Sequence, residues 1–134
     1  MKTERNTLAE LLRAAAENYG ERGFHFCGKS KGQISYRKLD QCAARMAGEW
    51  AQAGLKAGDH AFLCIDDTKL LTLVFWSGVY AGIVWEVVPY DTAALAGGVQ
   101  GKCLMKESAV RVLVSDNANL RERLSGTGIL RLFH

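Results

Sequence analysis

The sequence predicts an α/β domain in which a mostly parallel sheet is covered by helices on both faces. From Ser35 onward, segments with helical periodicity alternate with short apolar segments of strand length. The strand candidates are continuously apolar, which is typical of parallel strands that are buried on both sides. This alternation implies parallel strands that are joined by right-handed helical crossovers.

Length and composition fit one globular domain. The 134 residues are enough for a hydrophobic core, and 49% of them are hydrophobic, 23% are charged and one is proline, which argues against a disordered chain. The net charge of +3 is spread along the chain and does not indicate a nucleic-acid or membrane partner. Residues 1–134 are predicted to form a single partial domain, with a helix and hairpin in 1–33 and α/β layers in 34–134.

No targeting or membrane segment is predicted. Residues 1–12 carry charges on both sides of Asn6 and lack a long apolar run, so we expect a cytoplasmic protein without a secretory signal. The longest uncharged stretch, residues 70–85, is shorter than the ~20 residues that a membrane-spanning helix needs. Gly78 and Gly82 also interrupt it. A buried helix followed by a buried strand explains this stretch better.

The first predicted helix begins with a capping box, in which Thr7 is followed by Glu10 at the required spacing. Apolar residues then recur on one face, so the helix should be amphipathic and should end at Gly20. These residues are Leu8, Leu11, Leu12, Ala15, Ala16 and Tyr19.

A short β-hairpin is predicted next. Phe24 and Phe26 alternate with polar or small residues before a basic, exposed turn at 28–32, and Ile34 and Tyr36 do the same after it. The pattern predicts two antiparallel strands.

The clearest helix has Ser35 as its N-cap and ends at Gly54. Its apolar residues recur at intervals of three and four, which predicts one buried face. They are Leu39, Cys42, Ala43, Met46, Ala47, Trp50 and Ala53. After a turn at 54–59, residues 61–65 have the length and composition of a buried strand.

A further helix is predicted at 70–81, with its N-cap supplied by the polar residues at 66–68. It is apolar nearly all round, as expected of a helix packed between layers. Gly82 separates it from a β-branched strand at 83–88, which Pro89 ends. Helices at 99–107 and 117–124 and strands at 110–114 and 129–133 complete the predicted series.

One stretch matches the phosphate-loop pattern G-x-x-x-x-G-K-[ST], through Gly23, Gly28, Lys29 and Ser30. A functional loop needs a strand before it and a helix that opens at its lysine, so that backbone N–H groups point at the phosphates. Here strand-like residues fill the variable positions, and the next residues lead into another strand. The match is therefore predicted to be accidental.

Histidines and cysteines do not predict a metal site or a disulfide. The sequence has no Cys-x-x-Cys pair, and no two histidines lie at helical spacing from each other. The residues concerned are His25, His60 and His134, and Cys27, Cys42, Cys64 and Cys103. We expect surface or edge histidines and reduced core cysteines.

Two other segments that could bind a ligand are better interpreted as structural. Asp66 and Asp67 follow a predicted strand, where α/β proteins bind ligands, but a helix cap is the more common use of such residues. The glycine-rich stretch from Gly97 to Lys102 is one residue too short for a phosphate loop and is interpreted as a flexible helix entry. The sequence therefore predicts a scaffold to which no catalytic, cofactor-binding or metal-binding residue is assigned.

Several motifs resemble adenylation domains. Residues 34–40, Ile-Ser-Tyr-Arg-Lys-Leu-Asp, resemble their first core motif, and the turn at 54–59 resembles their Gly-hydrophobic-x-x-Gly-Asp turn. Residues 80–91 resemble the second core motif, where an Ala-Gly pair precedes a strand that ends at proline. Trp85 and Glu86 depart from that motif. Glu86 is compatible with altered strand pairing, a solvent-facing edge or a specific contact.

This resemblance covers residues 7–133 and implies the N-terminal subdomain of the adenylate-forming (AMP-binding) enzyme family. That family includes acyl-CoA synthetases, acyl-AMP ligases and nonribosomal peptide synthetase adenylation domains. Complete members use ATP and Mg to activate a carboxylic acid as an adenylate, and usually transfer it to coenzyme A or a carrier protein. The family's own phosphate loop, adenosine-binding residues and catalytic lysine have no counterpart in residues 1–134. No tight ATP binding by this chain is therefore expected.

Three hypotheses result. The first is the N-terminal fragment of a carboxylate-activating ligase, inactive alone, whose partner is the remainder of that ligase; the strand candidate at the very end of the chain favours it. The second is a non-catalytic binding or oligomerisation module that acts through an exposed sheet or the first helix. The third is an unrelated nucleotide-binding α/β protein, for which Mg-ATP should stabilise the chain and Lys29→Ala should remove that effect. The sequence does not identify the acid or the thiol acceptor.

Overall fold

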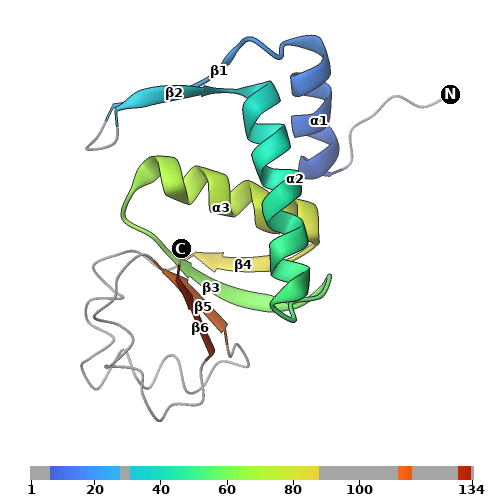
Figure 1. Cartoon of the computed structure of the whole chain (residues 1–134), viewed down its shortest axis with the longest axis vertical. Coiled ribbons are helices and arrows are strands. Elements are labelled where there is room, and N and C mark those ends of the chain that lie inside the picture. The colour runs from blue at the N-terminus through green and yellow to red at the C-terminus, as the bar shows by residue number, and fades with distance from the viewer. Residues whose placement is uncertain (1–6, 28–30, 88–111, 116–129, 134) are drawn as a thin grey trace, which may run out of the picture.

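The computed structural model describes residues 7–27, 31–87, 112–115 and 130–133. In Figure 1, α1 and a hairpin lie at one end, α2 crosses α3 in the middle, and a sheet lies beyond α3. The elements are α1 (Leu8–Asn18), β1 (Gly23–Phe26), β2 (Gly32–Ser35), α2 (Tyr36–Gln52), β3 (His60–Cys64), α3 (Thr68–Ala81), β4 (Val84–Val87), β5 (Val112–Ser115) and β6 (Leu130–Phe133).

The sheet confirms the predicted α/β class. Its four described strands have the order β4-β3-β5-β6, and each described pairing is parallel. β3 lies inside the sheet, between β4 and β5, and every residue from 61 to 65 is buried. Burial of consecutive residues is typical of an interior strand, because successive side chains point to opposite faces of the sheet.

The main core lies between α2, α3 and one face of the sheet. Its buried members are Met46, Trp50, Leu55, Ala61, Leu63, Ile65, Val74, Ile83 and Val114. Within this layer the Trp50 indole N–H donates to the Ser77 hydroxyl at 2.7 Å, and that hydroxyl donates to the Val74 carbonyl at 2.6 Å. A polar group at the centre of an apolar helix is thereby hydrogen-bonded, as buried polar groups must be.

The helix ends follow the predicted capping residues. The side chains of Thr7, Ser35 and Asp67 accept backbone N–H groups at the starts of α1, α2 and α3. α3 ends at Gly82, whose left-handed backbone (φ 80°) is easy for glycine. These boundaries depend on local chemistry, which explains why the sequence predicted them.

The hairpin is antiparallel and pairs Gly23 with Ser35 and Phe26 with Gly32. A Cβ atom at Gly23 would lie 1.8 Å from the Ile34 carbonyl oxygen, so close strand approach explains this glycine. Tyr36, predicted in the second strand, is instead the first residue of α2, because the Ser35 cap starts the helix there.

α1 ends at Asn18, before the predicted Gly20, and only part of its apolar face is buried. Leu12 and Ala16 are buried, but Leu8, Leu11 and Tyr19 are 49%, 52% and 57% exposed. The helix packs against α2 and α3 through a narrow stripe, so helical spacing identified the apolar face but not how much of it is covered.

The position of β4 in the sheet differs from the prediction. The segment at 83–88 was predicted to be a buried strand, but among the described strands β4 is an edge strand, and Val84 and Val87 are 43% and 59% exposed. Ile83, just before the strand, is buried. β-branched residues favour extended structure at an edge as well as in the interior, so they did not reveal the strand's position.

Some predictions lie outside the described residues. They concern the turn residues Gly28, Lys29 and Ser30, the end of the strand at Val88 and Pro89, the helices at 99–107 and 117–124, the stretch from Gly97 to Lys102, Cys103 and His134. Within the described part, no helix has the length and apolar character required to cross a membrane.

Candidate functional site

The phosphate-loop match does not form a phosphate loop. Gly23 begins β1, which fills the variable positions of the pattern, and Gly32 already belongs to β2. A phosphate loop is followed by a helix, whereas the next described element after the match is the strand β2. Gly23 instead permits the close approach of β1 to β2, a role that the sequence had not indicated.

The carboxyl edge of the sheet brings together residues that are far apart in sequence. Cys64, the last residue of β3, pairs with Ser115, the last residue of β5, and Asp66 and Asp67 follow β3 after Ile65. Asp67 caps α3 by accepting the Leu70 N–H at 3.4 Å, which supports the cap interpretation. Ser115 is fully buried and was not singled out from the sequence, although its place at a strand end was the available signal.

The predicted histidine positions are confirmed where they are described. His25 and His60 are both exposed. His60 Nδ1 lies 3.5 Å from the Glu86 carboxylate across the β3–β4 pair, and the strand register is regular. Glu86 is therefore a solvent-facing edge residue with a specific contact. Its unusual charge in the second motif does not alter strand pairing.

The cysteines are only partly core residues. Cys64 is buried and Cys42 is half-buried, but Cys27 is exposed at the end of β1, which corrects the expectation for that residue. None of these three described cysteines forms a disulfide. Among the described residues, no group of three or more His, Cys, Asp or Glu side chains could hold a metal ion.

Two of the segments that resemble adenylation-domain motifs, the turn at 54–59 and the Ala-Gly pair at 81–82, contact each other. The Gly58 N–H donates to the Gly82 carbonyl at 2.8 Å, and the Val84 N–H donates to the Asp59 carbonyl at 2.8 Å. A Cβ atom at Gly82 would lie 2.8 Å from the Cβ of Ala57. The turn before β3 and the turn before β4 thus pack against each other, and their glycines permit this close approach.

Tyr80 links three helices. Its hydroxyl donates to Asp40 of α2 at 2.5 Å, and the Arg13 guanidinium of α1 lies 4.9 Å from the centre of its ring. Burial raises the pKa of Tyr80 far above its usual range, and the hydrogen bond to Asp40 and the charge of that carboxylate add to the effect, while Arg13 opposes it. Tyr80 therefore stays protonated and serves as a donor, which suits a structural link and excludes a general base.

The link can be tested with Tyr80→Phe, which we expect to lower the free energy of unfolding by about 1–2 kcal/mol at neutral pH, because one hydrogen bond to a carboxylate is lost. The wild-type advantage should disappear as the pH rises above about 10, since the unfolded tyrosine then ionises while the folded one keeps its proton. Urea unfolding of both chains across this pH range measures the difference. Parallel pH profiles would contradict the role assigned to Tyr80.

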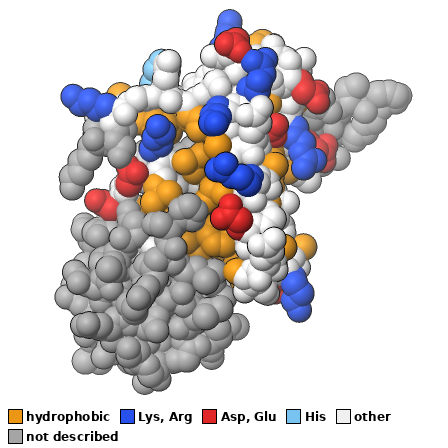
Figure 2. All heavy atoms as spheres, viewed as in Figure 1, with side chains coloured by type: hydrophobic (Ala, Val, Ile, Leu, Met, Phe, Trp, Pro, Cys, Tyr) orange, Lys and Arg blue, Asp and Glu red, His pale blue; other side chains and the backbone are white. Residues whose placement is uncertain are grey.

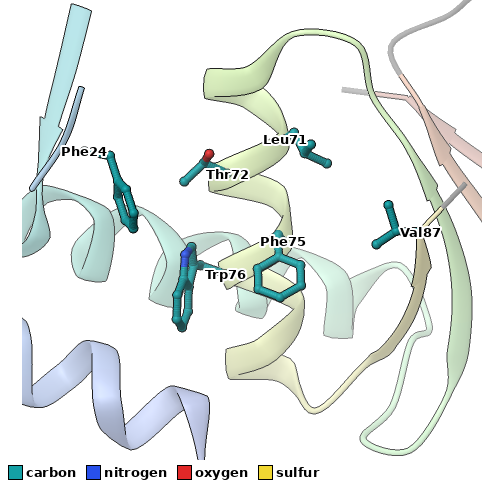
Figure 3. A pocket seen from close by; sticks show the side chains of 6 residues that line it. All are labelled: Phe24, Leu71, Thr72, Phe75, Trp76 and Val87. Atoms are coloured by element: carbon teal, nitrogen blue, oxygen red, sulfur yellow. The ribbon is translucent and has the colours of Figure 1, made fainter. Parts of the chain in front are cut away.

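A shallow apolar groove lies over α3. It has a volume of about 250 Å³ and is lined by Phe24, Leu71, Thr72, Phe75, Trp76 and Val87. Figure 3 shows Phe24 of β1 on one side of α3 and Val87 of β4 on the other. On the face seen in Figure 2, hydrophobic side chains gather across the middle of the molecule.

The groove offers little polar chemistry. Its one hydroxyl, on Thr72, donates to the Thr68 carbonyl of its own helix at 2.9 Å. Apart from Thr72, its one polar side-chain group is the Trp76 indole N–H, and no charged residue lines it to neutralise a phosphate or a carboxylate. It was not predicted from the sequence, because helix α3 is apolar nearly all round and spacing does not tell which side remains uncovered.

Comparisons with known proteins give a match in structure and none in sequence. No protein-family model and no curated protein matches the chain. NpsA-ThdA, an artificially fused adenylation–PCP di-domain NRPS from Klebsiella oxytoca, aligns with a TM-score of 0.79 and 17% identity over 98% of this chain and 23% of that chain.

Two further structures agree. The Klebsiella oxytoca NpsA N-terminal subdomain in complex with 3-hydroxyanthranilyl-AMSN gives a TM-score of 0.78 and 18% identity over 97% of this chain and 31% of that one. A fatty acid AMP ligase from Legionella pneumophila gives 0.75 and 17%, over 97% of this chain and 23% of that one. The chain therefore has the fold of one part of these proteins, and spans less than a third of their length.

Proposed function

We propose that this chain, which has the fold of the first part of adenylation domains and acyl-AMP ligases, is the N-terminal portion of an ATP-dependent ligase that forms acyl- or aminoacyl-adenylates. The observation that carries the proposal is the fold match over almost the whole chain, combined with the ordered motifs. A fatty acyl-adenylate ligase from L. pneumophila, which also matches this chain in structure, is described in complex with acyl adenylate and pyrophosphate, the products of such an activation step.

The motif residues support a scaffold role within that ligase. In the first motif, Ile34 is buried in the hairpin, Ser35 caps α2 and Leu39 is fully buried. In the second motif, Gly82 ends α3 and meets the turn at Gly58. These residues hold the layers together, and none of them carries a group poised for acid–base or nucleophilic chemistry.

The portion alone is proposed to be inactive. Adenylate formation needs cations around the phosphates, an oriented carboxylate and a closed site, and the described residues provide no such arrangement. ATP and Mg would serve the complete ligase, with a carboxylic acid as substrate and coenzyme A or a carrier protein as acceptor. A cytoplasmic location and the division into residues 1–33 and 34–134 belong to the same proposal.

Cover on both faces of the sheet is also part of the proposal. Ala61 and Leu63 pack against α2 and α3, whereas Phe62 and Cys64 point to the opposite face and are nevertheless buried, at 5% and 0% exposure. This burial supports a second layer on that face, as in a doubly covered parallel sheet.

The proposal is tested by size and activity together. An antibody against this chain should detect a polypeptide of several hundred residues in its own cells. That longer polypeptide should catalyse carboxylate-dependent exchange of pyrophosphate into ATP, and the 134-residue chain should show no exchange above background. Exchange by the 134-residue chain itself would refute the assignment to an inactive portion.

A non-catalytic assembly module is the second candidate, favoured by the exposed leucines Leu8 and Leu11 on α1. It predicts a cellular band at the size of the 134-residue chain and an oligomer in solution. A monodisperse monomer by sedimentation would weigh against it.

A further inference from the structure

The α3 groove continues into the open edge of the sheet. Val87, at the end of β4, forms one wall of the groove, and Phe75 and Trp76 of α3 contribute two half-buried rings in an edge-to-face contact, with centroids 5.7 Å apart. Within the described residues, β4 pairs with β3 along one edge and with no strand along the other. An unpaired edge beside an apolar groove is a surface that a further strand can extend.

We infer that this surface, the α3 groove together with the outer edge of β4, receives an apolar β-strand from the remaining polypeptide of the ligase. The inference rests on the proposed function. Backbone groups of the incoming strand would pair with β4, and one of its apolar side chains would enter the groove between Phe75 and Val87.

Two observations favour this occupant. The lining is apolar and uncharged, its Thr72 hydroxyl is already bonded within α3, and the Trp76 indole N–H is the one other polar side-chain group, so nothing there would neutralise the charge of a nucleotide or a free acid. The matched proteins, in turn, contain far more polypeptide than this chain, which covers 23% to 31% of them. Half-buried aromatic rings such as Phe75 and Trp76 are typical anchors of protein interfaces.

β4 itself provides a matched pair of variants. Val84 and Val87 are both exposed valines of the same strand, at 43% and 59%, and Val87 lines the groove whereas Val84 does not. Val87→Lys should therefore place a charge where the strand docks, and Val84→Lys should introduce the same side chain away from the groove. In the 134-residue chain, both substitutions should have little effect on stability because both sites face solvent.

Amide hydrogen exchange of β4 tests the inference. In the longer polypeptide from the source cells, amides of residues 84–87 should exchange at least about tenfold more slowly than in the 134-residue chain, a difference of about 1.4 kcal/mol in local opening. Val87→Lys should remove this added protection in the longer polypeptide, and Val84→Lys should retain it.

The other outcomes separate the two proposals. A longer polypeptide that is active in pyrophosphate exchange but shows equal β4 exchange, or equal effects of both lysine variants, would overturn the docking surface and leave the proposed function intact. The absence of any longer polypeptide would overturn both. A dimer of the 134-residue chain that Val87→Lys dissociates would assign the groove to a second copy, and would also overturn the inference.

Discussion

Leu63→Ala is expected to lower the free energy of unfolding by about 2–5 kcal/mol, which is a large share of the about 5–15 kcal/mol typical of a folded domain. Leu63 is fully buried in the interior strand β3 and pairs with Val87 on one side and Val114 on the other. It belongs to the core between α2, α3 and the sheet, so a truncated side chain would leave a cavity that strands on both sides prevent from closing.

Urea unfolding, followed by circular dichroism, measures this loss, and Leu11→Ala is its matched control. Leu11 is 52% exposed on α1, and alanine is an equally good helix former, so the same truncation should change stability by less than about 0.5 kcal/mol. A similar, small effect at both leucines would show that β3 is not the centre of the core.

Gly78→Ala is expected to destabilise the chain by about 2–4 kcal/mol, although alanine is normally the better helix residue. Gly78 lies inside α3, and a Cβ atom there would be 2.1 Å from the indole nitrogen of Trp85. That indole donates to the Phe75 carbonyl at 3.0 Å. The added methyl group would displace the ring, overpack the layer between α3 and β4 and break this hydrogen bond.

Gly48→Ala is the control for helix propensity. Gly48 lies in α2 on the exposed side, and nothing is within 4 Å of a Cβ atom built there. The substitution should stabilise the chain by about 0.5–1 kcal/mol, because it restricts the unfolded backbone without a clash. Opposite signs at the two helical glycines, in the same urea experiment, are the expected result. Stabilisation at both sites would contradict the packing of Trp85 against Gly78.

Much of the fold could be predicted because its signals are local. Ser35 and Gly54 bracket α2 through a hydrogen-bonding side chain and a left-handed backbone, with φ of 98° at Gly54, and neither depends on distant residues. The apolar run at 61–65 indicated an interior strand, since continuous hydrophobicity requires burial on both sides. The accidental phosphate-loop match was rejected on the same local grounds.

The candidate site was much less accessible to prediction. The groove depends on which side of an all-apolar helix stays uncovered, and the joint between Gly58 and Gly82 depends on two turns that meet only in the folded chain. Trp85, a departure from the second motif, became understandable only once its ring was seen against Gly78. The packing of a side chain against a glycine that is distant in sequence cannot be predicted from the spacing of neighbouring residues.

The sequence by itself determined the α/β class, the parallel character of the sheet and the capping residues, because periodicity and capping are properties of contiguous residues. The tertiary structure alone decided that Val84 and Val87 lie at an edge, that Leu8 and Leu11 remain exposed and that Tyr80 joins three helices. The physical reason is that burial depends on which elements pack together. A hydrophobic side chain favours the interior at every position, but only the assembled layers determine which positions are covered.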